Sequence, residues 1–372
     1  MRGVRMAGAR RWWLILGAVL AGAAVVCAVV VVRGAEGGEP GVERQARTAG
    51  ERFLDRYVDE DGRVVRRDQG DDTVSEGQAY AMLVAVALGD QARFSRVWGW
   101  TTHHLQRPDG LLSWHWQDGA VVDPQSAADA DVETARALLL AAERFGQPAY
   151  RRAGERIAGA ILRVETVTVG SQRVLMAGPW ARSLPAWIDP SYFIPGAFRL
   201  LYRTTGDARW RAVNRSSLSL LEHLTEPIPH LPPDWARLSF QGLAIPAPAP
   251  AGGGMAEFGL DAVRVPVQMA EDCRPAGRRI AASLWPFFRQ AATSGIVTRY
   301  DLQGHPLTQD RHPTGWVAAA AAAEAAGHQA WALSALDHAQ RMEAQHSTYY
   351  GAAWVALGRI LLTTRWLGGC GS

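Results

Sequence analysis

The sequence predicts an all-α protein, an (α/α)6 toroid in which about six helical hairpins close into a ring. Three observations lead to this fold class. About a dozen segments repeat apolar residues at the i, i+3, i+4 and i+7 spacing of an amphipathic helix. Many are joined in pairs by short turns, such as Phe145-Gly146-Gln147-Pro148 and Thr205-Gly206-Asp207, which is typical of repeated helical hairpins. The composition, 48% hydrophobic and 20% charged over 372 residues, is that of a globular protein with a real core.

The N-terminal segment predicts a membrane anchor followed by a linker. Residues 12–32 are apolar and uncharged, and a helix of this length crosses about 30 Å of hydrocarbon. Four arginines precede it in residues 1–11, which predicts a cytoplasmic basic segment and a periplasmic location for the rest of the chain. A cleaved signal peptide and a secreted protein are the alternative, but a signal peptide normally has a shorter apolar core of about 7 to 15 residues. Residues 33–41 are glycine-rich and predict a flexible linker.

The remainder predicts one helical domain over residues 42–366 and a short tail over residues 367–372. Its apolar periodicity places the helices as follows. They are expected at residues 42–58, 76–89, 92–106, 129–145, 149–163, 193–204, 207–225, 262–272, 277–291, 314–326, 329–342 and 351–364.

Two stretches interrupt this helical pattern. Residues 164–180 alternate β-branched with polar residues around Gly170-Ser171, which predicts a small β-hairpin. Residues 225–259 are rich in proline and glycine and cannot form a regular helix. Long ordered loops at one end of a helical ring are where we expect a binding cleft.

Composition and charge exclude several function classes. All 39 basic residues are arginine, so the chain has no lysine for a Schiff base or for a phosphate-binding loop. With a net charge of +3 and no basic run beyond the N-terminus, no nucleic-acid partner is expected. Cys273 and Cys370 have no companion residues at metal-ligand spacing, so neither a metal nor another cofactor is expected, and the sequence leaves open whether the two form a disulfide.

Three acidic motifs stand at the start of predicted helices. Glu76 lies in Ser75-Glu76-Gly77-Gln78-Ala79-Tyr80-Ala81-Met82, and Asp129 and Asp131 lie in Ser126-Ala127-Ala128-Asp129-Ala130-Asp131. Asp261 is followed one helical turn later by Arg264, which can keep the carboxylate ionised. Helix capping is the alternative for the first two motifs, and an ordinary surface ion pair is the alternative for the third.

Taken together, these motifs resemble those of the family-8 glycoside hydrolases over about residues 50–360. Smaller matches follow in the same order: Leu112-Ser113-Trp114-His115-Trp116, Asp189-Pro190-Ser191-Tyr192, Pro233-Asp234-Trp235 and Tyr349-Tyr350. The resemblance implies an (α/α)6 glycoside hydrolase, an inverting endo-β-1,4-glucanase (cellulase) whose substrate is a β-glucan outside the cytoplasmic membrane. It further implies a cellulose synthase complex as a partner at that membrane.

The resemblance also implies roles for the three acids. Glu76 corresponds to the general acid and Asp261 to the general base, while Asp129 corresponds to an active-site aspartate that we expect to bind the distorted sugar. In an inverting enzyme the acid and the base are about 6.5 to 9.5 Å apart, because a water molecule attacks from between them. Glu76 must be protonated near neutral pH, which requires burial or a nearby negative charge such as that of Asp129.

Further positions are expected to bind substrate. Aromatic side chains beside predicted loops suit stacking on glucose rings, although core packing is the alternative for each. The expected substrate contacts are Trp114, Trp116, Tyr192, Trp235, Tyr349, Arg264 and Asp131. Two positions depart from the family pattern. Leu260 replaces the usual tyrosine before the base, which bears on how Asp261 and its water are oriented, and Pro266 replaces a usual aromatic residue, which bears on substrate preference.

Two other functions stay open at the level of sequence. The same fold and mechanism can act on chitosan, xylan or mixed-linkage glucan, and the loops around residues 111–125 and 226–258 are not clearly enriched in the acids that chitosan would require. A catalytically inactive, membrane-anchored glucan-binding or assembly protein is the other alternative, and Leu260 and the anchor favour it.

Overall fold

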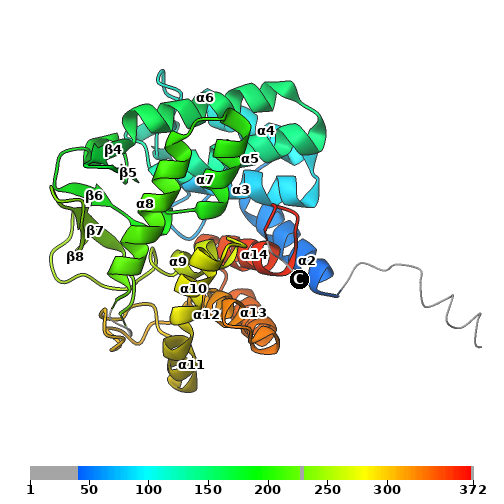
Figure 1. Ribbon diagram of the computed structural model, residues 1–372. Helices are drawn as coiled ribbons and strands as arrows, with labels where there is room; N and C mark the ends of the chain where they lie inside the picture. Colours follow the sequence, from blue (N-terminus) through cyan, green and yellow to red (C-terminus); the bar gives the residue numbers. More distant parts are fainter. Residues whose placement is uncertain (1–40, 227–229, 370–372) are drawn as a thin grey trace, which may run out of the picture. The chain divides into compact units, whose positions relative to one another are not determined.

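The computed structural model describes residues 41–226 and 230–369 (Figure 1). The expected basic segment, the anchor, the linker before Gly41 and the last three residues of the tail therefore lie outside the described residues. Within the described part, no helix is both long and apolar enough to span a membrane. Cys273 is disulfide-bonded, whereas Cys27 and Cys370 are not among the described residues.

The described chain is mostly helical, as predicted. The helices are α2 (Gly41–Tyr57), α3 (Ser75–Leu88), α4 (Gln91–His104), α5 (Ala128–Phe145), α6 (Pro148–Val164), α7 (Pro195–Thr205), α8 (Arg209–Leu224), α9 (Arg264–Ala270), α10 (Pro275–Ser283), α11 (Trp285–Ser294), α12 (Pro313–Ala325), α13 (Gln329–Gln345) and α14 (Tyr349–Thr363). The predicted hairpin turns are present, because α5 ends at Gly146 and α7 at Gly206, both with the left-handed backbone that glycine adopts readily.

Six of these helices close into an inner ring. Each inner helix packs against the next in the order α3, α5, α7, α9, α12 and α14, and α14 packs against α3 to close the ring. Each of the first five is packed against the outer helix that follows it, α4, α6, α8, α10 and α13. The sixth outer position belongs to α2, whose Gly50 lies against Val84 of α3 and whose Phe53 ring lies 6.4 Å from that of Tyr349 in α14. The arrangement matches the predicted ring of helical hairpins.

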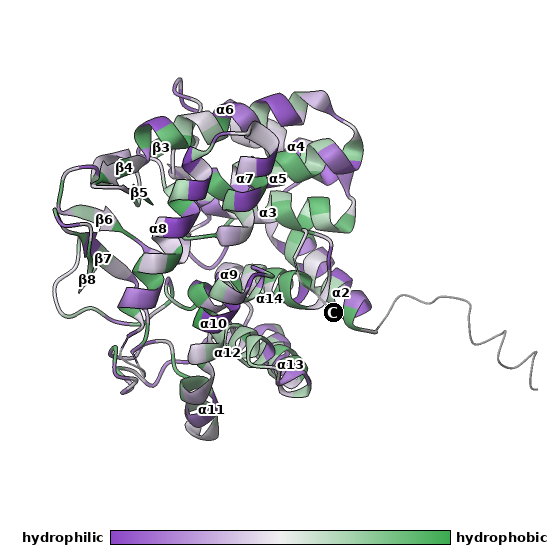
Figure 2. Cartoon of the chain, in the orientation of Figure 1, coloured by the Kyte–Doolittle hydropathy of each residue, from purple (hydrophilic) through white to green (hydrophobic). Residues whose placement is uncertain are grey.

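Position in the ring explains the hydropathy of each helix. Inner helices have neighbours on both sides, so α3 and α12 bury nearly all of their residues and are apolar around the whole circumference. Outer helices keep a single apolar stripe, as in α6, where Ala153, Ile157 and Ile161 are buried at helical spacing. Figure 2 shows this contrast, with α3 and α14 mostly green and α6 and α8 carrying purple turns.

One predicted helix is divided in the structure. We expected a continuous helix over residues 277–291, but α10 ends at Ser283 and α11 begins at Trp285. Pro286 explains the break, because proline has no N–H for the hydrogen bond to residue i−4 and its ring clashes with that carbonyl. Apolar periodicity continues across the break, so the pattern alone did not reveal it.

Three small antiparallel sheets supplement the helices. The predicted hairpin is formed by β4 (Thr166–Val169) and β5 (Gln172–Leu175), with the turn at Gly170-Ser171. The other two were not predicted, and they are β1 (Thr73–Val74) with β2 (His115–Gln117) and β3 (Ala120–Asp123), and β6 (Ala186–Ile188) with β7 (Trp235–Leu238) and β8 (Ala244–Ala247). In both sheets a strand of two to four residues pairs with one distant in sequence, which local patterns do not show.

Candidate active site

Arg264 is the centre of a cluster of four carboxylates. Its buried guanidinium, the first side chain of α9, donates from Nη1 to Glu76 Oε2 at 3.2 Å and to Asp129 Oδ2 at 2.9 Å. From Nη2 it donates to Asp261 Oδ1 at 3.0 Å and to Asp189 Oδ2 at 3.3 Å. The structure therefore brings together Glu76, Asp129, Asp261 and Arg264, all predicted from the sequence. The alternative of an isolated surface ion pair for Asp261 and Arg264 is wrong.

Several side chains of the site lie at the N-terminal ends of the inner helices. Glu76 is the second residue of α3, Asp129 the second of α5, and Tyr349 the first of α14. Helix N-termini carry partial positive charge, which favours acidic side chains at this end of the ring. The N-cap residues, Val74 and Ala127, make no side-chain capping hydrogen bond, and capping alone does not explain the acids, because Glu76 and Asp129 both contact Arg264.

Glu76 has the environment of a proton donor. The pKa of Glu76 is raised to about 7, mainly because the carboxyl is buried. The positive charge of Arg264 lowers this pKa, whereas the negative charges of Asp129 and Asp261 raise it. The side chain keeps 22% of its surface exposed, so it is accessible from outside. Tyr349 Oη donates to Glu76 Oε1 at 3.2 Å. Gly77 allows this contact, since a Cβ there would lie 2.9 Å from the Tyr349 hydroxyl.

Asp261 is the most exposed of the four carboxylates. Its side chain is 38% exposed, against 22% for Glu76, 7% for Asp129 and 0% for Asp189. The carboxylate is accessible to water and contacts Arg264 Nη2. An ionised carboxylate with room beside it can accept a proton from a water molecule, which is the chemistry of a general base.

The loop that carries Asp261 is fixed by two side chains whose roles the sequence did not reveal. Asp234 Oδ1 accepts hydrogen bonds from the backbone N–H of Gly259 at 2.8 Å and of Ala262 at 2.7 Å. Burial, followed by the charge of Asp261, raises the pKa of Asp234 to about 7. Tyr350 Oη donates to the carbonyl of Leu260 at 2.8 Å. These three bonds hold the loop through its backbone.

The side chain of Leu260 does not take part in this support. Its side chain is 41% exposed, and only its carbonyl is engaged, by Tyr350. The departure from the family's tyrosine therefore leaves the loop anchored. Gly259, immediately before it, is required by close packing, because a Cβ there would lie 2.4 Å from Asp234 Oδ2.

Asp189 is a third residue whose role was missed, although its motif was recognised. Its Oδ1 caps the short 3-10 helix Pro190–Tyr192 by accepting from Ser191 N at 2.8 Å, and its Oδ2 contacts Arg264. Burial, then the Asp261 charge, raises the pKa of Asp189 well above its usual value. The Asp-Pro-Ser capping pattern was the available signal, but it predicts a cap rather than a contact with Arg264.

A cavity of ≈ 420 Å³ opens beside Asp261 and is lined by Trp235, Met255 and Leu307 together with polar residues. Trp235 belongs to an aromatic group in which its ring lies 6.3 Å from that of Trp180 and 6.5 Å from that of Tyr192. Aromatic surface next to a carboxylate pair suits the apolar faces and hydroxyls of a sugar. Trp235 lines this cavity and Tyr192 lies beside it, while the contact of either ring with substrate stays a prediction.

Two other predicted substrate residues, Asp131 and Trp116, have local partners. Asp131 does not fit the prediction: it is fully buried and accepts from the Leu112 backbone N–H at 2.9 Å, so it supports the loop before β2. Trp116 packs edge-on against Trp100 at 5.4 Å and lies under Arg63. Asp131 thus has a structural role in place of direct contact with substrate, whereas Trp116 is half-buried and its contact with substrate stays a prediction.

Tyr349 and Trp114 contact the first residues of α3. Tyr349 is 1% exposed, so its contact is with Glu76 and it cannot stack on a sugar. Trp114 is half-buried, and its carbonyl accepts from Ser75 N at 2.9 Å, immediately before Glu76. Among the residues that the structure describes, no group of His, Cys, Asp and Glu is arranged to hold a metal ion.

Comparison with known proteins gives a consistent result. The family model described as Glycosyl hydrolases family 8 matches residues 41–363. A probable endoglucanase of Novacetimonas hansenii is 32% identical over 314 residues, which is 82% of this chain and 87% of that protein. An endoglucanase of Cellulomonas uda is 31% identical over 60% of this chain and 63% of its own length. The structure of endo-beta-1,4-glucanase CMCax from Acetobacter xylinum superposes with a TM-score of 0.73 at 28% identity, covering 85% of this chain and 97% of that one.

The similarity extends to a relative whose name describes the release of xylose. A reducing-end xylose-releasing exo-oligoxylanase of Paenibacillus barcinonensis is 28% identical over 70% of this chain and 72% of its own length.

Proposed function

The chain belongs to family 8 of the glycosyl hydrolases, and we propose that it cleaves internal β-1,4 bonds of a glucan with inversion of configuration. The observation that carries the proposal is the contact of one guanidinium, that of Arg264, with both Glu76 and Asp261. Hydrolysis of a glycosidic bond requires one protonated carboxyl at the leaving oxygen and one carboxylate that attacks carbon or activates water.

Glu76 is assigned the role of general acid and Asp261 that of general base. At neutral pH a carboxyl with a pKa of about 7 is protonated in a large share of molecules, and it can donate that proton to the leaving oxygen. Asp261, exposed and held by Arg264, accepts the proton of the attacking water.

The geometry limits the separation of the acid and the base. Because the two terminal nitrogens of a guanidinium are about 2.3 Å apart, Glu76 Oε2 and Asp261 Oδ1 lie at most about 8.5 Å from each other. This limit admits a water molecule between them, and it also admits the shorter spacing of about 5 to 5.5 Å found in retaining enzymes. The assignment of inversion therefore rests on the family, and the stereochemistry of the product tests it.

Asp129 is proposed to bind hydroxyls of the distorted sugar at the point of cleavage. Its Oδ1 accepts from Ala130 N at 2.8 Å and its Oδ2 from Arg264, so the carboxylate is held rigidly beside the acid. Burial raises the pKa of Asp129, with Arg264 opposing, and its negative charge in turn raises the pKa of Glu76. Asp129 thus supports the acid electrostatically while it positions the sugar.

Release of reducing ends tests this function. Carboxymethyl-cellulose, xylan, mixed-linkage glucan and chitosan are offered to wild type and to Glu76→Gln. We expect carboxymethyl-cellulose to be the best substrate and Glu76→Gln to lose at least about 100-fold in rate. Equal rates in the two proteins contradict the acid assignment. No release from any substrate supports the alternative of an inactive glucan-binding protein.

Xylan is the second candidate substrate, and the exo-oligoxylanase relative favours it. The departure at Pro266 also bears on substrate preference, since this buried position in α9 is usually aromatic in the family. A rate on xylan above that on carboxymethyl-cellulose would replace the glucan by xylan and leave the mechanism unchanged.

We further propose that residues 12–32 anchor the enzyme in the cytoplasmic membrane with its catalytic domain in the periplasm, next to a cellulose synthase complex. The support is the sequence alone, 21 apolar residues preceded by arginines. Extraction of membranes with alkaline carbonate should leave the full chain in the pellet, and recovery in the supernatant favours the secreted alternative. Co-purification with a synthase subunit tests the partner.

A further inference from the structure

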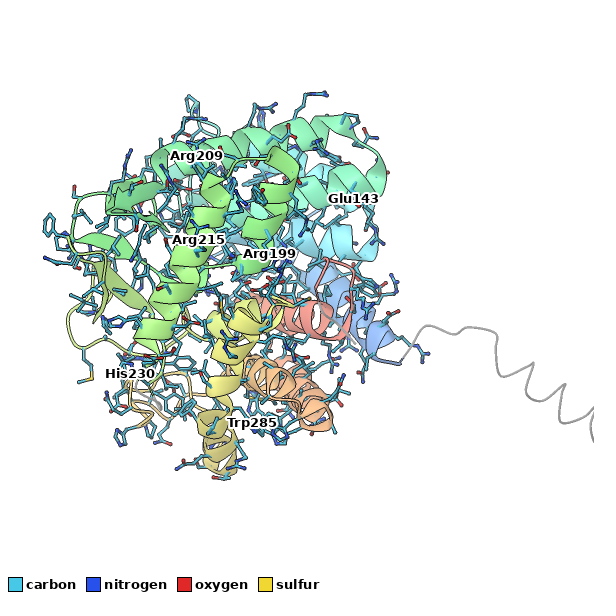
Figure 3. All side chains as sticks on the ribbon, in the orientation of Figure 1. Glu143, Arg199, Arg209, Arg215, His230 and Trp285 are labelled. Carbon is cyan, nitrogen blue, oxygen red and sulfur yellow. The ribbon has the colours of Figure 1, made fainter. Side chains whose placement is uncertain are left out.

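A second cavity lies outside the active site, where α7, α8 and the segment leading into α10 meet. Its volume is ≈ 580 Å³, the size of pockets that hold small molecules. Its lining shares no residue with the cavity beside Asp261. Five arginines line it, namely Arg199, Arg211, Arg215, Arg274 and Arg279. Figure 3 labels Arg199 on α7 and Arg215 on the neighbouring α8.

The charge of this cavity is strongly positive. Asp272 is the one acid in its lining, and it pairs with Arg199. Arg215 and Arg274 have no carboxylate within ion-pair distance in the part of the chain that the structure describes. Arg211 and Arg215 are four residues apart on α8, a spacing at which like charges destabilise a helix. This crowding of positive charge makes the binding of an anion favourable.

The charges on Arg199 and Arg274 also oppose each other directly. Burial lowers the pKa of Arg199; Asp272 raises it, and the neighbouring charge of Arg274 lowers it again. An anion bound between Arg199 and Arg274 offsets the repulsion between their charges. The buried carboxylate of Asp272, which pairs with Arg199, has the same effect.

The lining beneath the arginines is apolar and aromatic. Trp210 and Phe198 are fully buried and stack with ring centroids 5.8 Å apart, and the guanidinium of Arg211 lies 4.7 Å from the centre of the Tyr202 ring. Within the described residues, Trp210 Nε1 and Asn214 Oδ1 are buried without a hydrogen-bond partner. Buried polar atoms are normally satisfied, so these two atoms are exceptions within this lining.

We propose that this cavity binds an organic phosphate ester, with the phosphate among the arginines and the apolar part against the aromatic lining. Arginine is the side chain best suited to phosphate, because its planar fork donates two parallel hydrogen bonds to phosphate oxygens. A phosphate monoester carries up to two negative charges, which matches a site of several arginines better than a single carboxylate does. The ester is either a soluble phosphomonoester or the headgroup of an acidic phospholipid.

Binding is tested on the detergent-solubilised full chain at fixed ionic strength by isothermal titration calorimetry with phenyl phosphate. The test variant is Arg215→Gln/Arg274→Gln, which changes two exposed side chains. Its matched control is Arg152→Gln/Arg156→Gln, which removes the same charge from exposed positions of α6. We expect wild type and control to bind alike and the test variant to bind at least about 10-fold more weakly. Absence of binding to wild type, or an equal loss in both variants, overturns the proposal.

Two further ligands separate the sources of the phosphate. Tighter binding of short-chain phosphatidic acid than of phenyl phosphate assigns a lipid headgroup, and the reverse order assigns a soluble ester. Inorganic phosphate should bind more weakly than either, and equal affinity would refute the role of the aromatic lining. The release of reducing ends from glucan should be the same in wild type and in both variants, which shows that they are folded.

Discussion

Removal of the Arg264 guanidinium is expected to destabilise the protein more at pH 8 than at pH 5. The side chain contacts four carboxylates within 3.3 Å, and Arg264→Met leaves them without their shared cation. Breaking a buried ion pair by removing one partner costs about 3 to 5 kcal/mol. Burial already raises the pKa of Glu76, Asp129 and Asp189, and Arg264 is what opposes that rise.

The pH dependence follows from the sign of these shifts. A carboxyl whose pKa is higher in the folded than in the unfolded state destabilises the fold as the pH rises, because the unfolded state loses its proton first. Without Arg264 the pKa values of Glu76, Asp129 and Asp189 in the folded state rise further. The loss of stability on raising the pH from about 4 to about 8 is therefore larger in the variant. At pH 5 the carboxyls are largely protonated in the variant and need no cation, and the loss should be at most about half of that at pH 8.

Urea unfolding followed by tryptophan fluorescence at both pH values measures the effect. The control is Arg151→Met, which removes an exposed pair with Glu155 and should cost less than about 1 kcal/mol at either pH. A loss for Arg264→Met that is the same at pH 5 and pH 8 would refute the view that this arginine serves to neutralise the carboxylates.

Three further outcomes follow from the site. The turnover number should fall about tenfold for each pH unit above 7, because Glu76, with a pKa of about 7, must carry the proton it donates; a pH–rate profile that stays flat to pH 9 contradicts this. Asp234→Ala should lower turnover about tenfold or more, because it leaves two backbone N–H groups unpaired. Asp234→Asn keeps the accepting oxygen and should retain most activity. Equal losses in the two variants argue against a role of Asp234 in holding the loop. Gly77→Ala should displace Tyr349 from Glu76 and lower turnover. Because the tyrosine hydrogen bond lowers the pKa of Glu76, its loss should move the alkaline fall in rate to higher pH. An unchanged pH–rate profile speaks against that contact.

The helical architecture was largely predictable because its signals are local. Apolar periodicity and glycine turns such as Gly146 depend on residues within one or two helical turns, and they placed the ring helices correctly. The break at Leu284 was missed because the apolar spacing continues through Pro286. The two three-stranded sheets were missed because their short strands are stabilised by partners far along the chain.

The site was predictable to the extent that its residues lie in recognisable motifs. Glu76, Asp129 and Asp261 meet at Arg264 as expected. An acid at a helix start looks the same in sequence whether it contacts this arginine or a backbone N–H, which is why Asp131 was wrongly expected to contact substrate. The role of Asp234 depends on hydrogen bonds across 25 and 28 residues, which no local pattern contains.

The configuration of the first product tests the central claim most directly. If Glu76 donates the proton while Asp261 activates a water molecule on the opposite face of the sugar, a β-1,4-glucan must release a product whose new reducing end is the α-anomer. Proton NMR during the first minutes of hydrolysis, before mutarotation equilibrates the anomers, distinguishes the two forms. Initial appearance of the α-anomer is the predicted result, and initial appearance of the β-anomer would contradict the assignment of Asp261 as a base.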